Sequence, residues 1–231
     1  LEVSKKMKKL TLYIITYLSV AIFFALLFLA IFLPAGRLNF WNGWLYWLVF
    51  CIPTFMITAY FLQNDPALIE RRIRPAETRP AQIVGQSMAA ILFFGGIIIL
   101  PSLDYRFEWS FVPPWISMLG AVVVFGGFVI VFIVFKSNTF ASRSIEHMEG
   151  QQVIFTGLYS IVRHPMYSGA ILIIFATPVV LGSVLGLIPA VLLFFIIVLR
   201  IHDEEKMLKT ELIGYKEYCE KVRFRLIPYV W

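Results

Sequence analysis

The chain has 231 residues, of which 60% are hydrophobic and 15% are charged, and its mean hydropathy is +0.82. Soluble globular domains contain about 45–50% apolar and about 25% charged residues, so this composition excludes a soluble domain and predicts an integral membrane protein. The net charge is +6. Because the basic residues flank apolar runs, we expect them to face lipid headgroups and not nucleic acid.

Five runs contain no Asp, Glu, Lys or Arg: Leu10–Leu33, Trp44–Leu62, Ile83–Leu103, Pro114–Phe135 and Pro165–Leu199. A helix needs about 20 residues to cross the hydrocarbon core of a bilayer, so each of the first four runs predicts one span. The last run is too long for one span, and the sequence LGSVLG at its middle predicts a tight hairpin of two shorter helices. The expected fold is an all-α membrane protein with about six transmembrane helices.

If these helices cross in turn, all of the 20 Lys and Arg residues except Arg37 and Arg106 fall on one side. Cytoplasmic loops carry an excess of basic residues, which places both termini in the cytoplasm. The same side holds the long polar loop and the tail. We therefore divide the chain into an N-terminal region of four spans, residues 1–135, and a C-terminal region, residues 136–231, in which we expect any chemistry to take place on the cytoplasmic side.

The sequence YSIVRHPMYSG opens the fifth apolar run. Pro165 suits the first position of a helix, where its missing N–H is not needed. The free N–H groups and the dipole of that helix start would favour an anion beside His164 and Met166.

Arg200 and Glu204 stand four residues apart at the membrane boundary, where an ionisable side chain is costly unless it is paired or functional. In an antiparallel hairpin they return to the level of His164. We therefore expect a cluster at this level, and a simple pair between Arg200 and Glu204 remains the structural alternative.

Other residues nearby have plainer interpretations. Arg163 is interpreted as a positive-inside anchor. Glu205 is followed by Lys209 four residues later, which is typical of an exposed ion pair. His202 and Asp203 are expected to meet solvent.

The sequences GLYSIVRHPMYSG, RIHDEEKML, GYKEYCEKV and RLIPYVW resemble those of the isoprenylcysteine carboxyl methyltransferase family of membrane enzymes, which is related to the phospholipid N-methyltransferases. The resemblance covers about Asn138–Trp231. It implies S-adenosylmethionine as methyl donor, with S-adenosylhomocysteine as product, and a cytoplasmic donor pocket. The acidic run HDEE is shorter than in the eukaryotic enzymes, which indicates a prokaryotic relative in the inner or cell membrane.

Carried over to this sequence, the family's functional residues give a catalytic pair, Arg200 and Glu204, of which Arg200 also binds the acceptor. The implied donor-binding residues are Gln151, Gln152, Val153, Ile154, Tyr159, His164, Pro165, Met166, Tyr167, Glu204 and Glu205. A tyrosine face can hold a sulfonium by cation–π attraction. No metal is expected.

The acceptor is predicted from its chemistry. A carboxylate is already nucleophilic at neutral pH, and Arg200 can orient it through a bidentate fork, so we expect O-methylation of a lipophilic carboxylate of the isoprenylcysteine type. Phospholipid N-methylation is one alternative, and a small transporter or membrane scaffold is another. The expected partners are membrane lipids and a lipophilic or prenylated acceptor, without an obligate protein partner.

Overall fold

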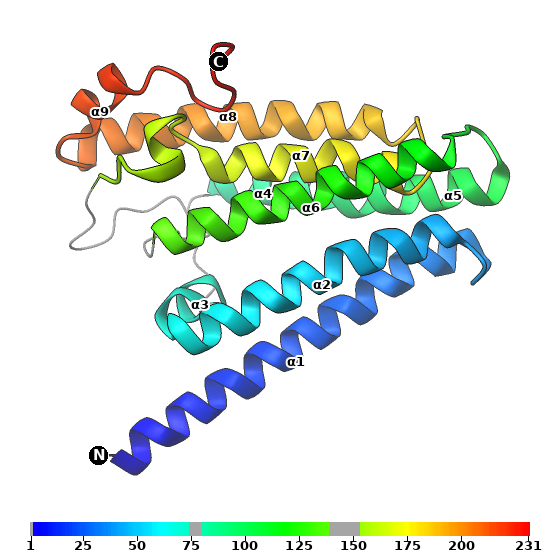
Figure 1. Cartoon of the computed structure of the whole chain (residues 1–231), viewed down its shortest axis with the longest axis horizontal. Helices are drawn as coiled ribbons and strands as arrows, with labels where there is room; N and C mark the ends of the chain where they lie inside the picture. The colour runs from blue at the N-terminus through cyan, green and yellow to red at the C-terminus, as the bar shows by residue number, and fades with distance from the viewer. Residues whose placement is uncertain (1, 74–79, 139–152) are drawn as a thin grey trace.

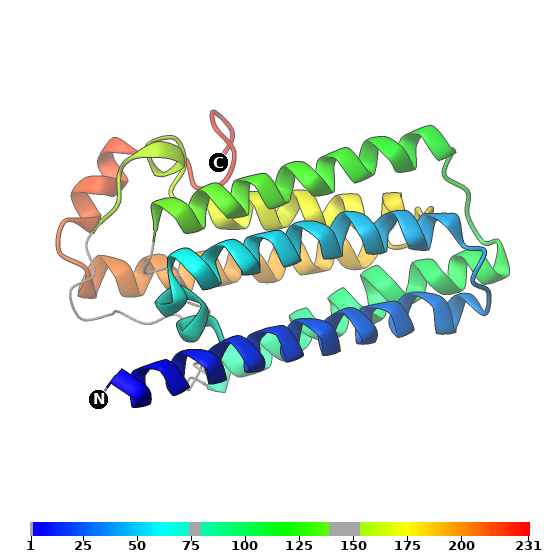
Figure 2. The same cartoon turned by 60° about the horizontal axis from the view of Figure 1, so that its bottom comes forward.

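The computed structural model describes residues 2–73, 80–138 and 153–231, and within these ranges the chain is helical and contains no strand. The long helices run along one common direction (Figures 1 and 2). In chain order the elements are α1 (Glu2–Ala35), α2 (Trp41–Asn64), α3 (Pro66–Ile73), α4 (Pro80–Ile91), the π-helix η1 (Leu92–Ile99), α5 (Leu100–Phe107), α6 (Pro114–Ser137), the 3₁₀ turn η2 (Gly157–Ser160), α7 (Pro165–Val180), α8 (Leu187–Glu211) and α9 (Tyr215–Lys221).

Four helical stretches are long and apolar enough to cross a membrane: Lys9–Ala35, Trp41–Asn64, Ile83–Phe107 and Pro114–Ser137. They coincide with the first four predicted spans, which are therefore confirmed as apolar helices. The third combines α4, η1 and α5 without a break. The chain is an integral membrane protein by the length and composition of these helices.

The predicted hairpin is also confirmed, because α7 ends at Val180 and α8 begins at Leu187. α7 has 16 residues and is shorter than the four long spans, so the count of six crossings stays a prediction. Two short helices that lie outside the apolar runs, α3 and α9, were not predicted.

The α6–α7 pair depends on two glycines that face each other. A Cβ atom on Gly127 would lie 2.7 Å from the carbonyl oxygen of Gly169, and one on Gly169 would lie 2.9 Å from that of Gly127. Both distances are too short for real side chains. The two backbones therefore approach closely, as small residues allow in membrane helix pairs.

Buried polar groups tie down the turn of the hairpin. The Asp104 carboxylate accepts hydrogen bonds from the Ser110 N–H at 2.7 Å and from the Ser183 hydroxyl. Asn42 Nδ2 donates to the Val180 carbonyl at 2.8 Å. Because the turn is held at this end, the relative register of α7 and α8 is set at the other end, where the predicted site lies.

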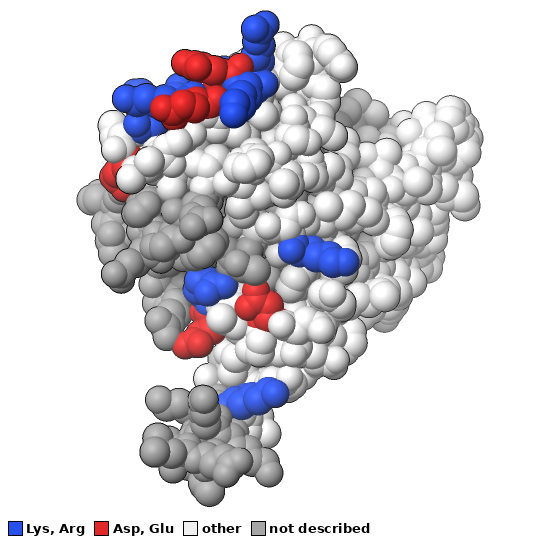
Figure 3. All heavy atoms as spheres, turned by 60° about the vertical axis from the view of Figure 1, so that its left-hand side comes forward, with Lys and Arg blue, Asp and Glu red and all other residues white. Residues whose placement is uncertain are grey.

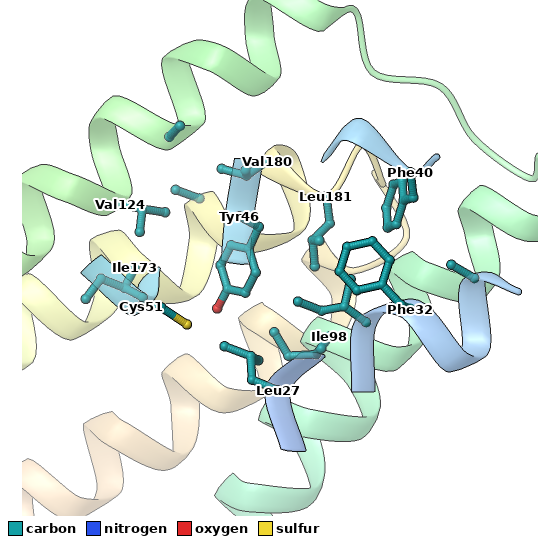
Figure 4. Close-up of a cluster of buried hydrophobic side chains, with 14 of the residues drawn as sticks. Leu27, Phe32, Phe40, Tyr46, Cys51, Ile98, Val124, Ile173, Val180 and Leu181 are labelled. Carbon is teal, nitrogen blue, oxygen red and sulfur yellow. The ribbon is translucent and has the colours of Figure 1, made fainter. Parts of the chain in front are cut away.

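The largest apolar cluster lies between these two ends and joins α1, α2, η1, α6 and α7 (Figure 4). Its labelled members are Leu27, Phe32, Phe40, Tyr46, Cys51, Ile98, Val124, Ile173, Val180 and Leu181.

The two ends of the molecule differ in charge. The N-terminus, α3, η2 and α9 lie at one end, and the α1–α2 and α5–α6 connections lie at the other (Figure 1). Seen from the first end, the Lys, Arg, Asp and Glu side chains gather in patches on an otherwise uncharged surface (Figure 3). This grouping follows the predicted division of basic residues. The side of the membrane on which each end lies stays a prediction.

Candidate active site

The start of α7 is held by the C-terminal segment of the chain. The backbone N–H groups of Arg163 and His164 donate to the carbonyls of Phe224 and Arg225, each at 2.9 Å. The Ser168 hydroxyl donates to the Leu226 carbonyl at 2.7 Å. Backbone hydrogen bonds therefore anchor the RHP motif to residues about 60 positions later. The sequence RLIPYVW contributed to the family resemblance, but no role was predicted for these residues.

Glu205 is the centre of a buried ion cluster, and its side chain is only 3% exposed. Its Oε1 lies 2.8 Å from Arg163 Nε and 3.3 Å from His164 Nε2. Its Oε2 lies 3.1 Å from Arg225 Nε and 3.8 Å from Lys209 Nζ. One carboxylate thus links the RHP motif, α8 and the C-terminal segment.

Two interpretations made from the sequence are wrong here. Arg163 is not a surface anchor, since it is 8% exposed and its Nη1 also donates to the carbonyl of Val222 at 3.2 Å. Glu205 is not a solvent-exposed partner of Lys209. Sequence spacing relates only neighbouring residues, whereas the burial arises because the C-terminal segment folds back over this face of α8. Removing one partner of such a buried pair is strongly destabilising.

The electrostatics of the cluster follow from its composition. Burial on its own would raise the pKa of Glu205, but the hydrogen bond to His164 and the charges of Arg163 and Arg225 outweigh it and lower this pKa to about 2. The carboxylate is therefore ionised at neutral pH. One carboxylate cannot neutralise two guanidinium groups, so this cluster of described residues carries a net positive charge.

A second hydrogen-bonded group lies beside this cluster. Arg200 Nε donates to the Tyr167 hydroxyl at 2.9 Å, and the Tyr167 hydroxyl donates to Glu204 Oε2 at 2.9 Å. The His164 and Tyr167 rings lie 5.8 Å apart. The predicted meeting of α7 with Arg200 and Glu204 at one level is confirmed, and Tyr167 bridges the two charged side chains.

The other predicted donor-binding residues surround this level in different ways. Tyr159 lies in η2, where its hydroxyl accepts from Asn138 Nδ2 at 3.0 Å and burial raises its pKa. Its carbonyl accepts from the Tyr218 hydroxyl at 2.7 Å. Pro165 is buried as the first residue of α7, as predicted. Tyr159 is thus fixed by contacts from both sides.

The remaining candidates are largely apolar contacts. Val153 packs against the cluster formed by the end of α8 and α9, and Ile154 is partly buried. Met166 packs against buried side chains of α2, α3 and α6. Gln151 and Gln152 lie outside the described residues. Val153 thus lies against the end of α8 and α9, whereas Met166 lies on the side of α7 that faces α2, α3 and α6.

The polar groups at this level fit the amino-acid end of S-adenosylmethionine. Within the described residues, the start of α7 has no side-chain cap, so its first N–H groups and the nearby positive charge suit a carboxylate. The Glu204 carboxylate suits an ammonium or ribose hydroxyls. The Tyr215 hydroxyl is buried and has no hydrogen-bond partner within the part of the chain that the structure describes, which leaves a donor and an acceptor for a polar ligand.

Parts of this chain are similar to known proteins. Residues 115–212 match the family model described as phospholipid methyltransferase. Over 93 residues, or 38% of this chain, the sequence is 30% identical to the delta(14)-sterol reductase TM7SF2 of Mus musculus, and the match covers only 22% of that relative. The chain is also similar to the solved structure of the eukaryotic intramembrane Ras methyltransferase ICMT (isoprenylcysteine carboxyl methyltransferase), with a TM-score of 0.47 and 17% identity over 94% of this chain and 86% of that chain.

The matched family segment contains both halves of the site, the start of α7 and the Arg200–Glu204 face of α8. The sequence-based resemblance to the membrane methyltransferases is thereby confirmed for this part of the chain. Together with the apolar helices, the match supports the class of membrane methyltransferase for this chain.

Proposed function

We propose that the chain is an S-adenosylmethionine-dependent methyltransferase of the membrane that methylates the carboxylate of a lipophilic acceptor. The observation that carries the proposal is the hydrogen-bonded group of Arg200, Tyr167 and Glu204 beside the start of α7, which no side chain of the described residues caps. It lies in the segment that matches the phospholipid methyltransferase model. The site and both termini are placed on the cytoplasmic side, in line with the distribution of basic residues.

The residues of this site would act by binding and orientation. S-adenosylmethionine, when bound, supplies a methyl group on a positively charged sulfur. The start of α7 with His164 would bind the donor's carboxylate, and Glu204 would bind its ammonium or ribose end. Arg200 would hold the acceptor oxygen in line with the methyl group. Such orientation can be worth about 7–11 kcal/mol of the barrier.

Charge balance favours an anionic acceptor. An ammonium acceptor would add a third cation, next to the sulfonium and the Arg200 guanidinium. A carboxylate next to Arg200 is attracted instead, by about 4 kcal/mol at 4 Å for an effective dielectric constant near 20. A carboxylate also needs no base before it attacks.

Phospholipid N-methylation remains a second candidate because the matched family model bears that description. In this case Arg200 would hold the phosphate, and the amine proton would have to leave. The Glu204 carboxylate is the group placed to accept it. In either case we propose that residues 1–135 mainly form the membrane scaffold and that the catalytic region is residues 136–231. The family match itself begins at residue 115, near the start of α6.

The test uses the purified chain in lipid nanodiscs. We expect titration calorimetry to show binding of S-adenosylmethionine, and labelled donor to transfer its methyl group to a prenylcysteine analogue in preference to phosphatidylethanolamine. Glu204→Gln should weaken donor binding, whereas Glu211→Gln, an exposed change at the end of the same helix, should not. Preferred methylation of phosphatidylethanolamine would select the second candidate.

Because part of the chain is similar to a sterol reductase, the binding experiment includes a second ligand. Reductases of this kind of substrate need a hydride donor, so a reduced nicotinamide nucleotide is titrated in parallel. Binding of that nucleotide without any binding of S-adenosylmethionine would overturn the methyltransferase proposal.

A further inference from the structure

The strongest unassigned feature of the site is the hydroxyl of Tyr167. It accepts a hydrogen bond from Arg200 Nε at 2.9 Å and donates one to Glu204 Oε2 at 2.9 Å. The sequence-based resemblance placed Tyr167 only among the donor contacts. We propose that the Tyr167 hydroxyl is a positioning residue that orients the Arg200 guanidinium toward the acceptor. The identity of that acceptor rests on the proposed function.

The direction of these hydrogen bonds explains how the orientation arises. A phenol has one proton, and here it points to a carboxylate. Its oxygen is therefore polarised and becomes a better acceptor for the Arg200 N–H. In this way Glu204 strengthens the hydrogen bond of Arg200 by polarising the Tyr167 hydroxyl that lies between them.

The bond to Nε also restricts how Arg200 can bind an acceptor. The guanidinium is planar, and a carboxylate can bind either along the Nε side or across the two terminal nitrogens. While Tyr167 occupies the Nε side, a carboxylate cannot bind bidentately along that side. The hydroxyl thus excludes one approach direction in the plane of the group.

Tyr167 is itself held firmly enough to serve as a reference. It lies in the first turn of α7, one helical turn from the backbone bonds that tie Arg163 and His164 to the C-terminal segment. Its ring packs against the buried cluster that includes Ile197, Ile201 and Leu226. The Arg200 side chain is longer than that of Tyr167 and partly exposed, so it has more rotamer freedom to lose. The tyrosine therefore orients the arginine, and not the reverse.

The experiment is a double-mutant cycle with Tyr167→Phe and Arg200→Ala in the full chain. Phenylalanine keeps the ring and removes only the hydroxyl, so donor affinity should stay within threefold. The kcat/KM for the prenylcysteine analogue should fall about 10- to 100-fold, the range expected for a hydrogen bond to a charged group. In the Arg200→Ala background the same change should alter this kcat/KM less than twofold. Tyr60→Phe, on α2 and away from this site, is the matched control.

The outcomes separate this inference from the proposed function. If the wild type transfers methyl groups and Tyr167→Phe is as active as the wild type, or the two changes are additive, the inference fails alone. If the wild type neither binds S-adenosylmethionine nor transfers a methyl group, the proposed function fails. The four proteins of the cycle, which are the wild type, the two single variants and the double variant, are then compared by thermal unfolding. Additive shifts of Tm would show that the hydroxyl does not orient Arg200.

Discussion

Exchanging Glu205 for glutamine removes one negative charge from the centre of a buried cluster. Arg163 and Arg225, whose Nε atoms lie 2.8 Å and 3.1 Å from the carboxylate, then both lose this counterion. Breaking a buried ion pair by removing one partner costs about 3–5 kcal/mol. A second estimate comes from the pKa of Glu205. Its fall from about 4.3 in the unfolded chain to about 2 corresponds to about 3 kcal/mol at neutral pH.

The two estimates agree on a loss of about 3 kcal/mol, a large part of the 5–15 kcal/mol by which domains are typically stable. For a chain of this length we expect Tm to fall by about 6–12 °C, at about 2–4 °C per kcal/mol. The assay is thermal unfolding in detergent, followed by tryptophan fluorescence. Glu211→Gln serves as the control because that residue is exposed on the same helix.

A pH series tests the same reasoning. The folded-state pKa of Glu205 is depressed, so its stabilisation is fully present above the unfolded pKa of about 4.3. It is lost as the pH falls toward about 2. The Tm difference between the wild type and Glu205→Gln should therefore narrow between these two values. A difference below 2 °C at pH 7 would refute the buried cluster and restore the interpretation of Glu205 as an exposed residue.

Three further changes have distinct expected outcomes. Glu204→Gln should weaken S-adenosylmethionine binding about tenfold, because one charge-assisted hydrogen bond is lost, and should change Tm little. Titration calorimetry measures both the affinity and the fraction of active protein. Arg200→Lys should lower turnover of a carboxylate acceptor about 10- to 100-fold at unchanged donor affinity, because an ammonium cannot replace a bidentate fork; a collapse of donor affinity instead would assign Arg200 to the donor. Gly127→Ala should destabilise the chain by about 1–3 kcal/mol, because the added methyl group overpacks against the Gly169 carbonyl. Gly126→Ala is the control: a Cβ there meets nothing within 4 Å, so this change should be neutral in the same unfolding assay.

The elements of the fold follow closely from local patterns. The uncharged runs predicted the four long helices, and the length of the last run together with LGSVLG predicted the α7–α8 hairpin. Pro165 predicted where α7 begins. These inferences succeed because hydrocarbon thickness and helical rise convert sequence length directly into structure.

The site was predicted in part. Arg200 and Glu204 were identified because charged residues directly after an apolar run are costly, and the hairpin topology returned them to the level of His164. Arg225 was missed because no local pattern indicates which part of a polar tail folds back. The roles of these residues remain predictions that the experiments above test.

Glu204 and Glu205 show most clearly what each level of description decides. The sequence alone determines that two adjacent carboxylates on a helix point about 100° apart. It does not determine which neighbours they meet. Only the tertiary structure directs Glu204 toward Tyr167 and Glu205 toward Arg163 and Arg225. The physical reason is burial: the C-terminal segment covers one face of α8, and a covered carboxylate must find its cations there.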